Sequence, residues 1–226
     1  MAILTAEEFK ERLKTQHTVA NVTVKEPVTI DFRDGGSFSG DLMIRNCELK
    51  SFRMSDCQLT SLTIQKGSIK ELVFQTNAQI QKVSIIRCSV QAMTTTETLF
   101  GEFEYIAGEA KTVLTGQFPS LNKLSLSGAV KSITFINPSC SVIQFTNFQA
   151  AEVSMISLQP GALNCKNVVC NKMNINYGSQ TFESIVLENL ISKDFQLLSE
   201  GVRSLKYKGE LKYLAMSNVP EPVPVP

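Results

Sequence analysis

The chain has 226 residues, 43% of them hydrophobic, and its 22 Lys and Arg residues nearly balance its 21 Asp and Glu residues. This balance excludes strong overall attraction to nucleic acid or to anionic membranes, and it excludes an acidic surface that imitates DNA. No cationic start precedes an apolar segment, and no apolar stretch approaches the roughly 18 residues that span a bilayer. We therefore expect a cytoplasmic protein whose six cysteines stay reduced.

The N-terminal segment has the pattern of a helix that caps a repeat domain. Thr5 and Glu8 have the spacing of a capping box, in which each side chain binds the backbone N–H of the other residue. Phe9 and Leu13 share one face of this helix and can cover the end of a stack of strands. His17, the single histidine, falls in the following linker, so Ser-His or Cys-His catalysis has only this base available.

A hydrophobic pattern with a period of about ten residues runs from residue 42 to residue 207. At nearly every step an apolar residue is followed two positions later by another, which is typical of the inward face of a short strand. The first strong pairs are Leu42/Ile44, Phe52/Met54, Leu62/Ile64 and Leu72/Phe74. Weaker pairs such as Cys47/Leu49 and Cys57/Leu59 lie between them, so the inward positions recur about every five residues.

The residue before a weaker pair is often one that tolerates a left-handed backbone, which suits a corner. These residues are Asn46, Asp56, Asn137, Asn147 and Asn167. A ten-residue unit has no room for a crossover helix, which leaves parallel strands stacked in a coil. Four five-residue sides give about twenty residues per coil and a rod on the order of 40 Å long. The sequence therefore predicts an all-β fold, a single-stranded, parallel, right-handed β-helix with an N-terminal capping helix.

We expect three segments: a capping helix and linker over residues 1–20, a β-solenoid over 21–213, and a mobile Pro-rich tail over 214–226. Because proline lacks a backbone donor, we expect the tail not to extend the sheet.

The hydrophobic pattern is weakest over residues 91–120, where both an insertion and an unbroken coil remain open. In this region the ten-residue spacing predicts that Val113 and Thr115 point inward, and that Leu114 points outward.

The chain resembles two families of solenoid proteins. The residues that share the five-residue spacing of pentapeptide-repeat proteins are Ile44, Leu49, Met54, Leu59, Ile64, Ile69 and Phe74. That family forms a square, right-handed β-helix. The stretch from Leu49 to Leu59 is similar to the core of a leucine-rich repeat, which is the second resemblance. Both families serve mainly as binding scaffolds, so both resemblances imply a binding function.

Outward positions on successive coils are expected to align into flat, polar ladders. One ladder is predicted to contain Thr94, Leu114, Thr134, Ser154, Asn174 and Gln196. The other is predicted to contain Thr63, Ser84, Glu104, Ser125, Gln144 and Asn164. Such ladders can bind a glycan, ice or another sheet, or can simply keep parallel strands soluble without charge repulsion. We take Thr94, Thr134, Ser154, Asn174 and Gln196 as the candidate binding residues.

One acidic patch is the other candidate site. It comprises Glu97, Glu102, Glu104 and Glu109. Glu102 and Glu104 flank Phe103 and should point outward from one strand, where two carboxylates could act as acid and base on a glycan. The cysteines lack metal-binding or redox spacing and are expected in the core, so we expect no metal and no cofactor.

The sequence thus predicts a non-enzymatic scaffold or binding module that recognises a macromolecule along a flat solenoid face. We expect a protein partner or self-association, with a glycan as a further option, and neither nucleic acid nor a membrane. The alternatives are a small glycan-active β-helix enzyme that uses Glu102 and Glu104, and a self-assembling structural protein.

Overall fold

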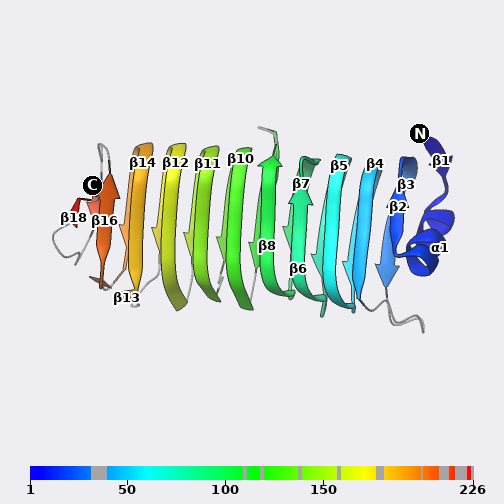
Figure 1. The fold of residues 1–226 in the computed structure, drawn as a ribbon, viewed down its shortest axis with the longest axis horizontal. Helices are drawn as coiled ribbons and strands as arrows, with labels where there is room; N and C mark the ends of the chain where they lie inside the picture. The colour runs from blue at the N-terminus through cyan, green and yellow to red at the C-terminus, as the bar shows by residue number, and fades with distance from the viewer. Residues whose placement is uncertain are drawn as a thin grey trace.

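The fold is a parallel β-solenoid of about nine turns. The computed structural model describes residues 1–31, 40–108, 111–117, 120–136, 139–156, 159–176, 181–199, 201–208, 214–216 and 223–224. The coils follow one another along a straight rod, and helix α1 (Ala6–Gln16) lies at the N-terminal end (Figure 1). Over these described residues, no helix has the length and apolar character that a membrane crossing needs. The predicted all-β solenoid with an N-terminal helix is confirmed.

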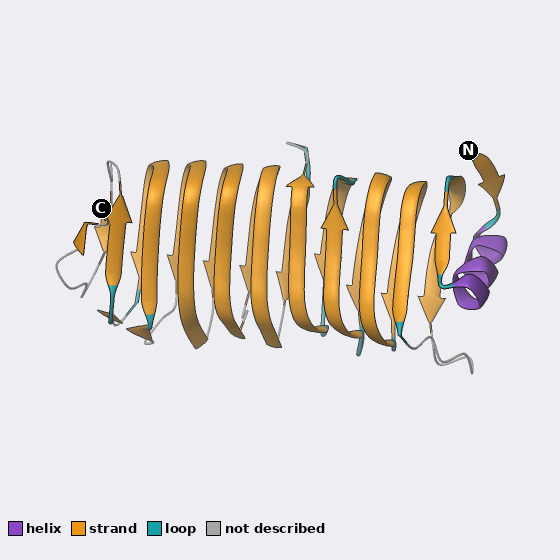
Figure 2. Cartoon of the chain, in the orientation of Figure 1, coloured by secondary structure: helices purple, strands orange, loops and turns teal. Residues whose placement is uncertain are grey.

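Long strands that run around several sides of a coil make up most of the chain (Figure 2). They are β3 (Val22–Asp31), β4 (Asp41–Ser55), β5 (Gln58–Gln75), β8 (Leu99–Gly108), β10 (Ser120–Ile136), β11 (Ser139–Ile156), β12 (Gln159–Asn176) and β14 (Ser184–Leu198). The shorter strands are β1 (Ala2–Leu4), β2 (Thr18–Ala20), β6 (Gln79–Ile86), β7 (Ser89–Thr95), β9 (Val113–Gln117), β13 (Thr181–Phe182), β15 (Gly201–Val202), β16 (Leu205–Lys208), β17 (Leu214–Met216) and β18 (Val223–Pro224).

Each coil has four sides, which we number from the coil of residues 41–60. Side I comprises residues 41–45, side II 46–50, side III 51–55 and side IV 56–60, with the equivalent residues of the other coils. Pairing between coils is parallel and keeps like positions together: Leu42 lies beside Leu62, and Phe52 beside Leu72. Because adjacent parallel strands lie about 4.8 Å apart, each side carries straight columns of residues along the rod.

The inward positions form one continuous apolar core, as the five-residue spacing predicts. On the coil of residues 41–60 the buried side chains are Leu42, Ile44, Cys47, Leu49, Phe52, Met54, Cys57 and Leu59. All six cysteines are buried, so their predicted place in the core is confirmed. A thiol packs there as a small hydrophobic side chain.

The first corner of the coil, between sides I and II, requires a left-handed backbone. Asn147, Asn167 and Asn189 occupy it on three successive coils with φ of 49°, 53° and 52°. Their side chains form an amide ladder, in which Asn167 donates to Asn147 and Asn189 donates to Asn167, each over 2.9 Å. Asparagine suits this corner because it tolerates the left-handed region and its amide can both donate and accept.

The second corner, between sides III and IV, also uses a left-handed residue on the early coils. Asp56 and Glu97 have φ of 48° and 53° there. The predicted corner roles of Asn46, Asp56, Asn147 and Asn167 are therefore confirmed, whereas Asn137 lies outside the described residues.

At the N-terminal end, the predicted capping box is present. The Thr5 N–H donates to Glu8 Oε2 over 2.8 Å, and the Glu8 N–H donates to Thr5 Oγ1 over 3.2 Å. The Thr5 N–H and the Thr5 hydroxyl both donate to the Glu8 carboxylate, which holds the pKa of Glu8 below its ordinary value. Phe9 is fully buried, with its ring edge-on to Phe52 at a centroid distance of 6.2 Å. His17 is exposed and ends α1 in a left-handed conformation.

Two short strands beside this helix were not predicted from the sequence. Strand β1 pairs with β3, and β2 pairs with β4, so residues assigned to the cap and linker already belong to the sheet. Three-residue strands are too short to show a repeated pattern, which is why the periodicity did not reveal them.

The coil continues through the described part of residues 91–120, but with a shift in register. Strands β7, β8 and β9 each pair in parallel with neighbouring coils. The prediction that Val113 and Thr115 point inward is wrong, because Leu114 is fully buried while Thr115 is exposed. Met93 pairs with Leu114 and Leu114 with Ile133, so a step of 21 residues precedes a step of 19. Because one step is a residue longer and the next a residue shorter than twenty, the two changes cancel, and a fixed ten-residue spacing does not reveal them.

The tail also differs from expectation. Strands β17 and β18 lie within residues 214–226 and pair with β14 and β16, so parts of this segment do extend the sheet. Val223 and the carbonyl group of Pro224 can still form ladder hydrogen bonds, because proline lacks only the donor.

The amide ladder makes a measurable prediction. We expect Asn167→Ala to lower the free energy of unfolding by about 1–2 kcal/mol, because alanine tolerates the left-handed region less well than asparagine and the change removes two side-chain hydrogen bonds. Urea denaturation would measure this change. Asn171→Ala, an exposed change on the same strand, should stay within about 0.5 kcal/mol of the wild type. Equal effects of the two changes would contradict a structural role for the ladder.

A second prediction concerns the N-terminal cap. Phe9→Ala should lower the free energy of unfolding by about 3–5 kcal/mol, because it leaves a cavity against Phe52. Since each coil contacts only its neighbours, hydrogen exchange should rise first in β3 and β4 and hardly change in β12. Lys14→Ala, on the exposed face of α1, serves as the control. Uniform exchange along the rod would show that the cap does not act locally.

Candidate functional site

The predicted binding residues form one straight column along side III. Parallel pairing aligns Thr94, Thr115, Thr134, Ser154, Asn174 and Gln196. All five residues chosen from the sequence therefore lie together, as the stacking predicts. Thr115 takes the place expected for Leu114, which is a consequence of the register shift. The column thus carries short, neutral polar side chains over six consecutive coils.

The centre of side III carries no charge. On three consecutive coils its residues are 92–96, 113–117 and 132–136, and none of them is Asp, Glu, Lys or Arg. Their columns are in register, because Ala92 lies beside Val113 and Val113 beside Ser132. On the coils that follow, the charges of side III stand in its first column alone, where Lys172 lies 4.0 Å from Glu152.

An exposed apolar column borders this ladder on the later coils. Ile136, Ile156 and Leu198 are 43%, 44% and 44% exposed, and pairing places them in one row with Asn176. Each follows its ladder residue by two positions, on the same outward face. This column was not predicted from the sequence. A third apolar residue directly after each inward pair would have indicated it.

One ladder atom on side III has an unmet hydrogen-bonding capacity. The Asn174 side-chain oxygen is buried and accepts no hydrogen bond from the described residues. Gln196, the next residue in the column, donates instead to Asp194 over 3.2 Å. A buried acceptor without a donor is costly, so this oxygen favours a ligand that brings an N–H or O–H group.

The acidic patch is only partly assembled. Glu102 and Glu104 point outward from β8 on either side of buried Phe103, as predicted. Their carboxylates lie 3.5 and 3.2 Å from the Lys82 ammonium group on the neighbouring coil. Ser84 also donates to Glu104 over 3.1 Å. Lys82 was not predicted as the partner of these glutamates, because the position of Lys82 beside them depends on the stacking of separate coils.

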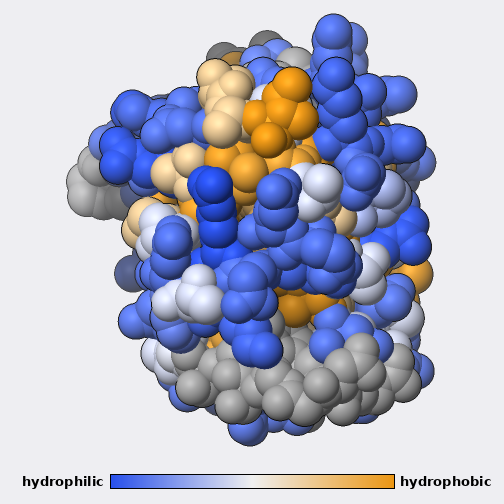
Figure 3. Space-filling model, turned by 90° about the vertical axis from the view of Figure 1, so that its right-hand side faces the viewer, coloured by the Kyte–Doolittle hydropathy of each residue, from blue (hydrophilic) through white to orange (hydrophobic). Residues whose placement is uncertain are grey.

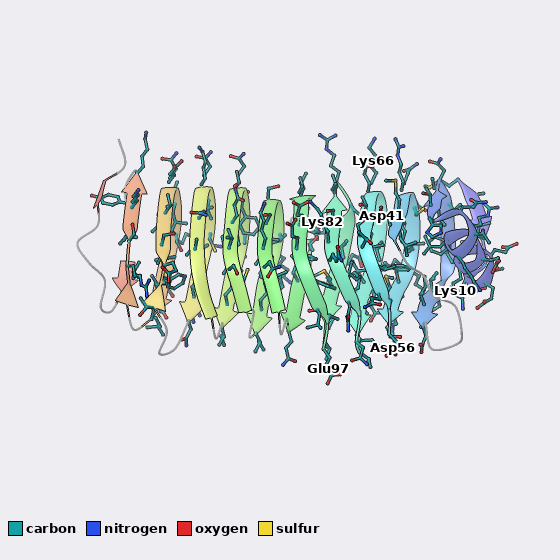
Figure 4. The ribbon with its side chains drawn as sticks, turned by 60° about the horizontal axis from the view of Figure 1, so that its bottom comes forward. Lys10, Asp41, Asp56, Lys66, Lys82 and Glu97 are labelled. Carbon is teal, nitrogen blue, oxygen red and sulfur yellow. The ribbon has the colours of Figure 1, made fainter. Side chains whose placement is uncertain are left out.

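Glu97 does not join the pair of Glu102 and Glu104. Glu97 stands at the corner between sides III and IV, whereas Glu109 lies outside the described residues. Figure 4 shows Lys82 on the face of the rod and Glu97 at its lower edge.

A shallow groove of about 960 Å³ runs along side IV and the start of side I. Small and polar residues line it, among them Gly40, Thr60, Gln81, Gly101 and Asn122. Gly101 is needed for the close approach of the coils, because a Cβ atom there would lie 2.5 Å from the Gln81 carbonyl oxygen. Glu102 is among the lining residues, and Glu104 is not.

The thiols are protected from reaction by burial. Desolvation raises the pKa of Cys57 and Cys165 to about 12, and that of Cys140 and Cys170 to about 11. Because the thiolate is the reactive and metal-binding form, these thiols are unreactive in the folded chain. Across the described residues, no group of three or more His, Cys, Asp or Glu side chains could hold a metal ion.

The N-terminal end presents a mixed surface. Met1 and Ile3 are 62% and 68% exposed, and the end view in Figure 3 shows apolar surface between polar groups. Helix α1 and strand β1 cover this end of the core, which is the region that a self-assembling solenoid would use.

Comparison with known proteins assigns the chain to no group: no family model, no curated protein and no solved structure matches it.

The Lys82 cluster predicts a pH-dependent contribution to stability. Hydrogen bonding to Glu104 and the nearby carboxylates raise the pKa of Lys82 above its ordinary value of 10.5. Its contribution is therefore complete below that value and is lost as the pH rises through the higher, folded-state pKa. Because Lys82 is half-exposed, we expect Lys82→Gln to cost only about 0.5–1 kcal/mol at neutral pH.

Urea denaturation of Lys82→Gln and wild type across this pH range would measure the difference. Lys131→Gln, which removes an exposed lysine elsewhere, is the matched control. A difference between Lys82→Gln and wild type that persists far above pH 10.5 would rule out the ion pairs as its cause.

Proposed function

We propose that the protein is a non-enzymatic scaffold that binds a protein partner along side III. The observation that carries the proposal is the uncharged centre of this side, formed by residues 92–96, 113–117 and 132–136. Charged residues are depleted from the cores of protein interfaces, because burying them costs desolvation energy. A flat surface of Thr, Ser, Ala and Val also loses little side-chain entropy when a partner covers it.

The exposed apolar column adds the other component of an interface. Ile136, Ile156 and Leu198 offer apolar area beside hydrogen-bonding hydroxyl and amide groups. Six coils of five residues span roughly 500 Å² in plan, below the roughly 800 Å² that one partner gives to a standard interface. The apolar column is the last of the five columns of side III, so it supplies the apolar part of this area.

A pair of double variants tests this proposal. Thr134→Lys with Ser154→Lys places two charges in the centre of side III and should weaken partner binding by about tenfold or more. Gln144→Lys with Asn164→Lys makes the same change in the polar ladder of side I, and should leave binding intact. Both pairs replace outward polar residues, so both variants should fold, which thermal denaturation would verify.

Binding would be measured by affinity capture from cells that produce the protein, followed by quantitative mass spectrometry. Proteins that the side I variant retains and the side III variant loses would support the proposal. Equal retention by both variants would refute it.

A further inference from the structure

A cluster of cations occupies side II of the first four coils, which we call the basic side. It consists of Lys25, Lys50, Lys66, Lys70 and Arg87 on side II, with Arg45 at the adjoining end of side I, all of them exposed. Lys25, Lys50 and Lys70 line one groove of about 310 Å³ together with Thr23, Glu48 and Ser68. Lys66 and Arg87 stand in the adjacent corner column. In Figure 4, Lys66 points from one edge of the rod, and Asp56 and Glu97 lie at the opposite edge.

In the groove of the basic side, three lysines stand against one carboxylate. Within the described part of the chain, none of the six forms an ion pair, whereas Arg53 and Lys82 on other sides do. Glu26 accepts from the Ala6 N–H over 3.2 Å, and Glu48 accepts from the Thr23 hydroxyl over 3.1 Å. Glu48 lines the groove and keeps its negative charge there, which leaves the three lysines in excess. The whole chain has a net charge of only +1, so this local excess is a property of one side.

Two cations of the basic side stand at the left-handed corner between sides I and II. Lys66 and Arg87 adopt left-handed conformations, with φ of 56° and 50°. A left-handed backbone costs an ordinary residue roughly 1–2 kcal/mol, and asparagine less. The later coils place Asn147, Asn167 and Asn189 at the same corner and gain an amide ladder there. Asn21 and Asn46 on the first two coils form a similar amide bond over 2.7 Å. Ala107 takes the corner after Arg87 with φ of 55°, so the corner accepts several residue types, and the placement of cations at two of its positions adds charge without changing the fold.

We propose that the basic side binds an acidic, extended segment of a protein partner. Successive coils place the lysines of a column about 4.8 Å apart, well within the Debye length of about 10 Å at moderate salt, so their fields add. Flexible lysines suit carboxylates at varied positions along a peptide. No aromatic side chain lines the groove to stack on nucleic-acid bases.

The length of the basic side also fits a short segment. Lys70 is followed in its column by Gln91, and Arg87 is followed in its column by Ala107, so the continuous run of cations stops there, and Lys131 and Lys193 on later coils stand apart from it. A footprint of this length matches a few carboxylates and is too short for a long polyanion to follow. The basic side is separate from side III, and its function does not depend on the function proposed for that side.

The test uses a fluorescent oligo-glutamate peptide and the full chain, with binding followed by fluorescence anisotropy at low and moderate salt. We expect binding that weakens as salt rises, and a loss of about tenfold or more in Lys50→Glu with Lys70→Glu. Lys131→Glu with Lys193→Glu makes the same charge change on side II of later coils and is the matched control. It should bind nearly as the wild type does, after correction for the small change in net charge.

Several results would overturn the proposal. They are no binding of the peptide at low salt, or an equal loss in both double variants, which would indicate attraction to net charge alone. Tighter binding of a single-stranded oligonucleotide or of anionic phospholipid vesicles than of the peptide would show that the partner class is wrong. The charge changes lie on exposed side chains, and circular dichroism would verify that each variant stays folded.

Discussion

The structure depends on in-register parallel pairing between coils. Each coil must place its inward residues directly beside those of its neighbours, because a slip of one residue would turn every apolar side chain outward. The core tolerates coils of different length only where a corner absorbs the difference. Thus Leu163 pairs with Ile185 after 22 residues, whereas Leu42 pairs with Leu62 after 20. The pairing rule fixes the interior and leaves the outward residues free to differ from coil to coil.

That freedom divides the surface by side. Side III is neutral in its centre, side I carries the Lys82 cluster, side II is basic on the early coils, and side IV holds the shallow groove. A globular protein of the same size would mix such groups, but a rod keeps each kind in a column. Two partners could therefore occupy different sides of one coil without competing for the same residues.

Much of this architecture is readable from the sequence, because it follows from a local rule. The alternation of apolar residues predicts the inward positions, and asparagine before a weak pair predicts a corner such as Asn167. The stacked ladder of side III followed from the same count. The wrong predictions lay where the ten-residue spacing changes, as at Leu114. The strands that were not predicted, such as β1, are too short to show a repeated pattern. The ion pair between Lys82 and Glu104 could not be predicted from the sequence, because it joins separate coils through flexible side chains.

The buried thiols have a consequence for how the rod unfolds. Burial raises the pKa of Cys57 to about 12, so this thiol stays protonated at neutral pH and an alkylating reagent can modify it only after its coil opens. The cysteines occur in the second, fourth and later coils, which makes each a natural marker of its own region. Labelling rates at Cys57 and Cys165 would then report the opening free energies of coils near the two ends of the same molecule. The cysteines that pack in the core thus allow the stability of separate regions of the rod to be measured in one molecule.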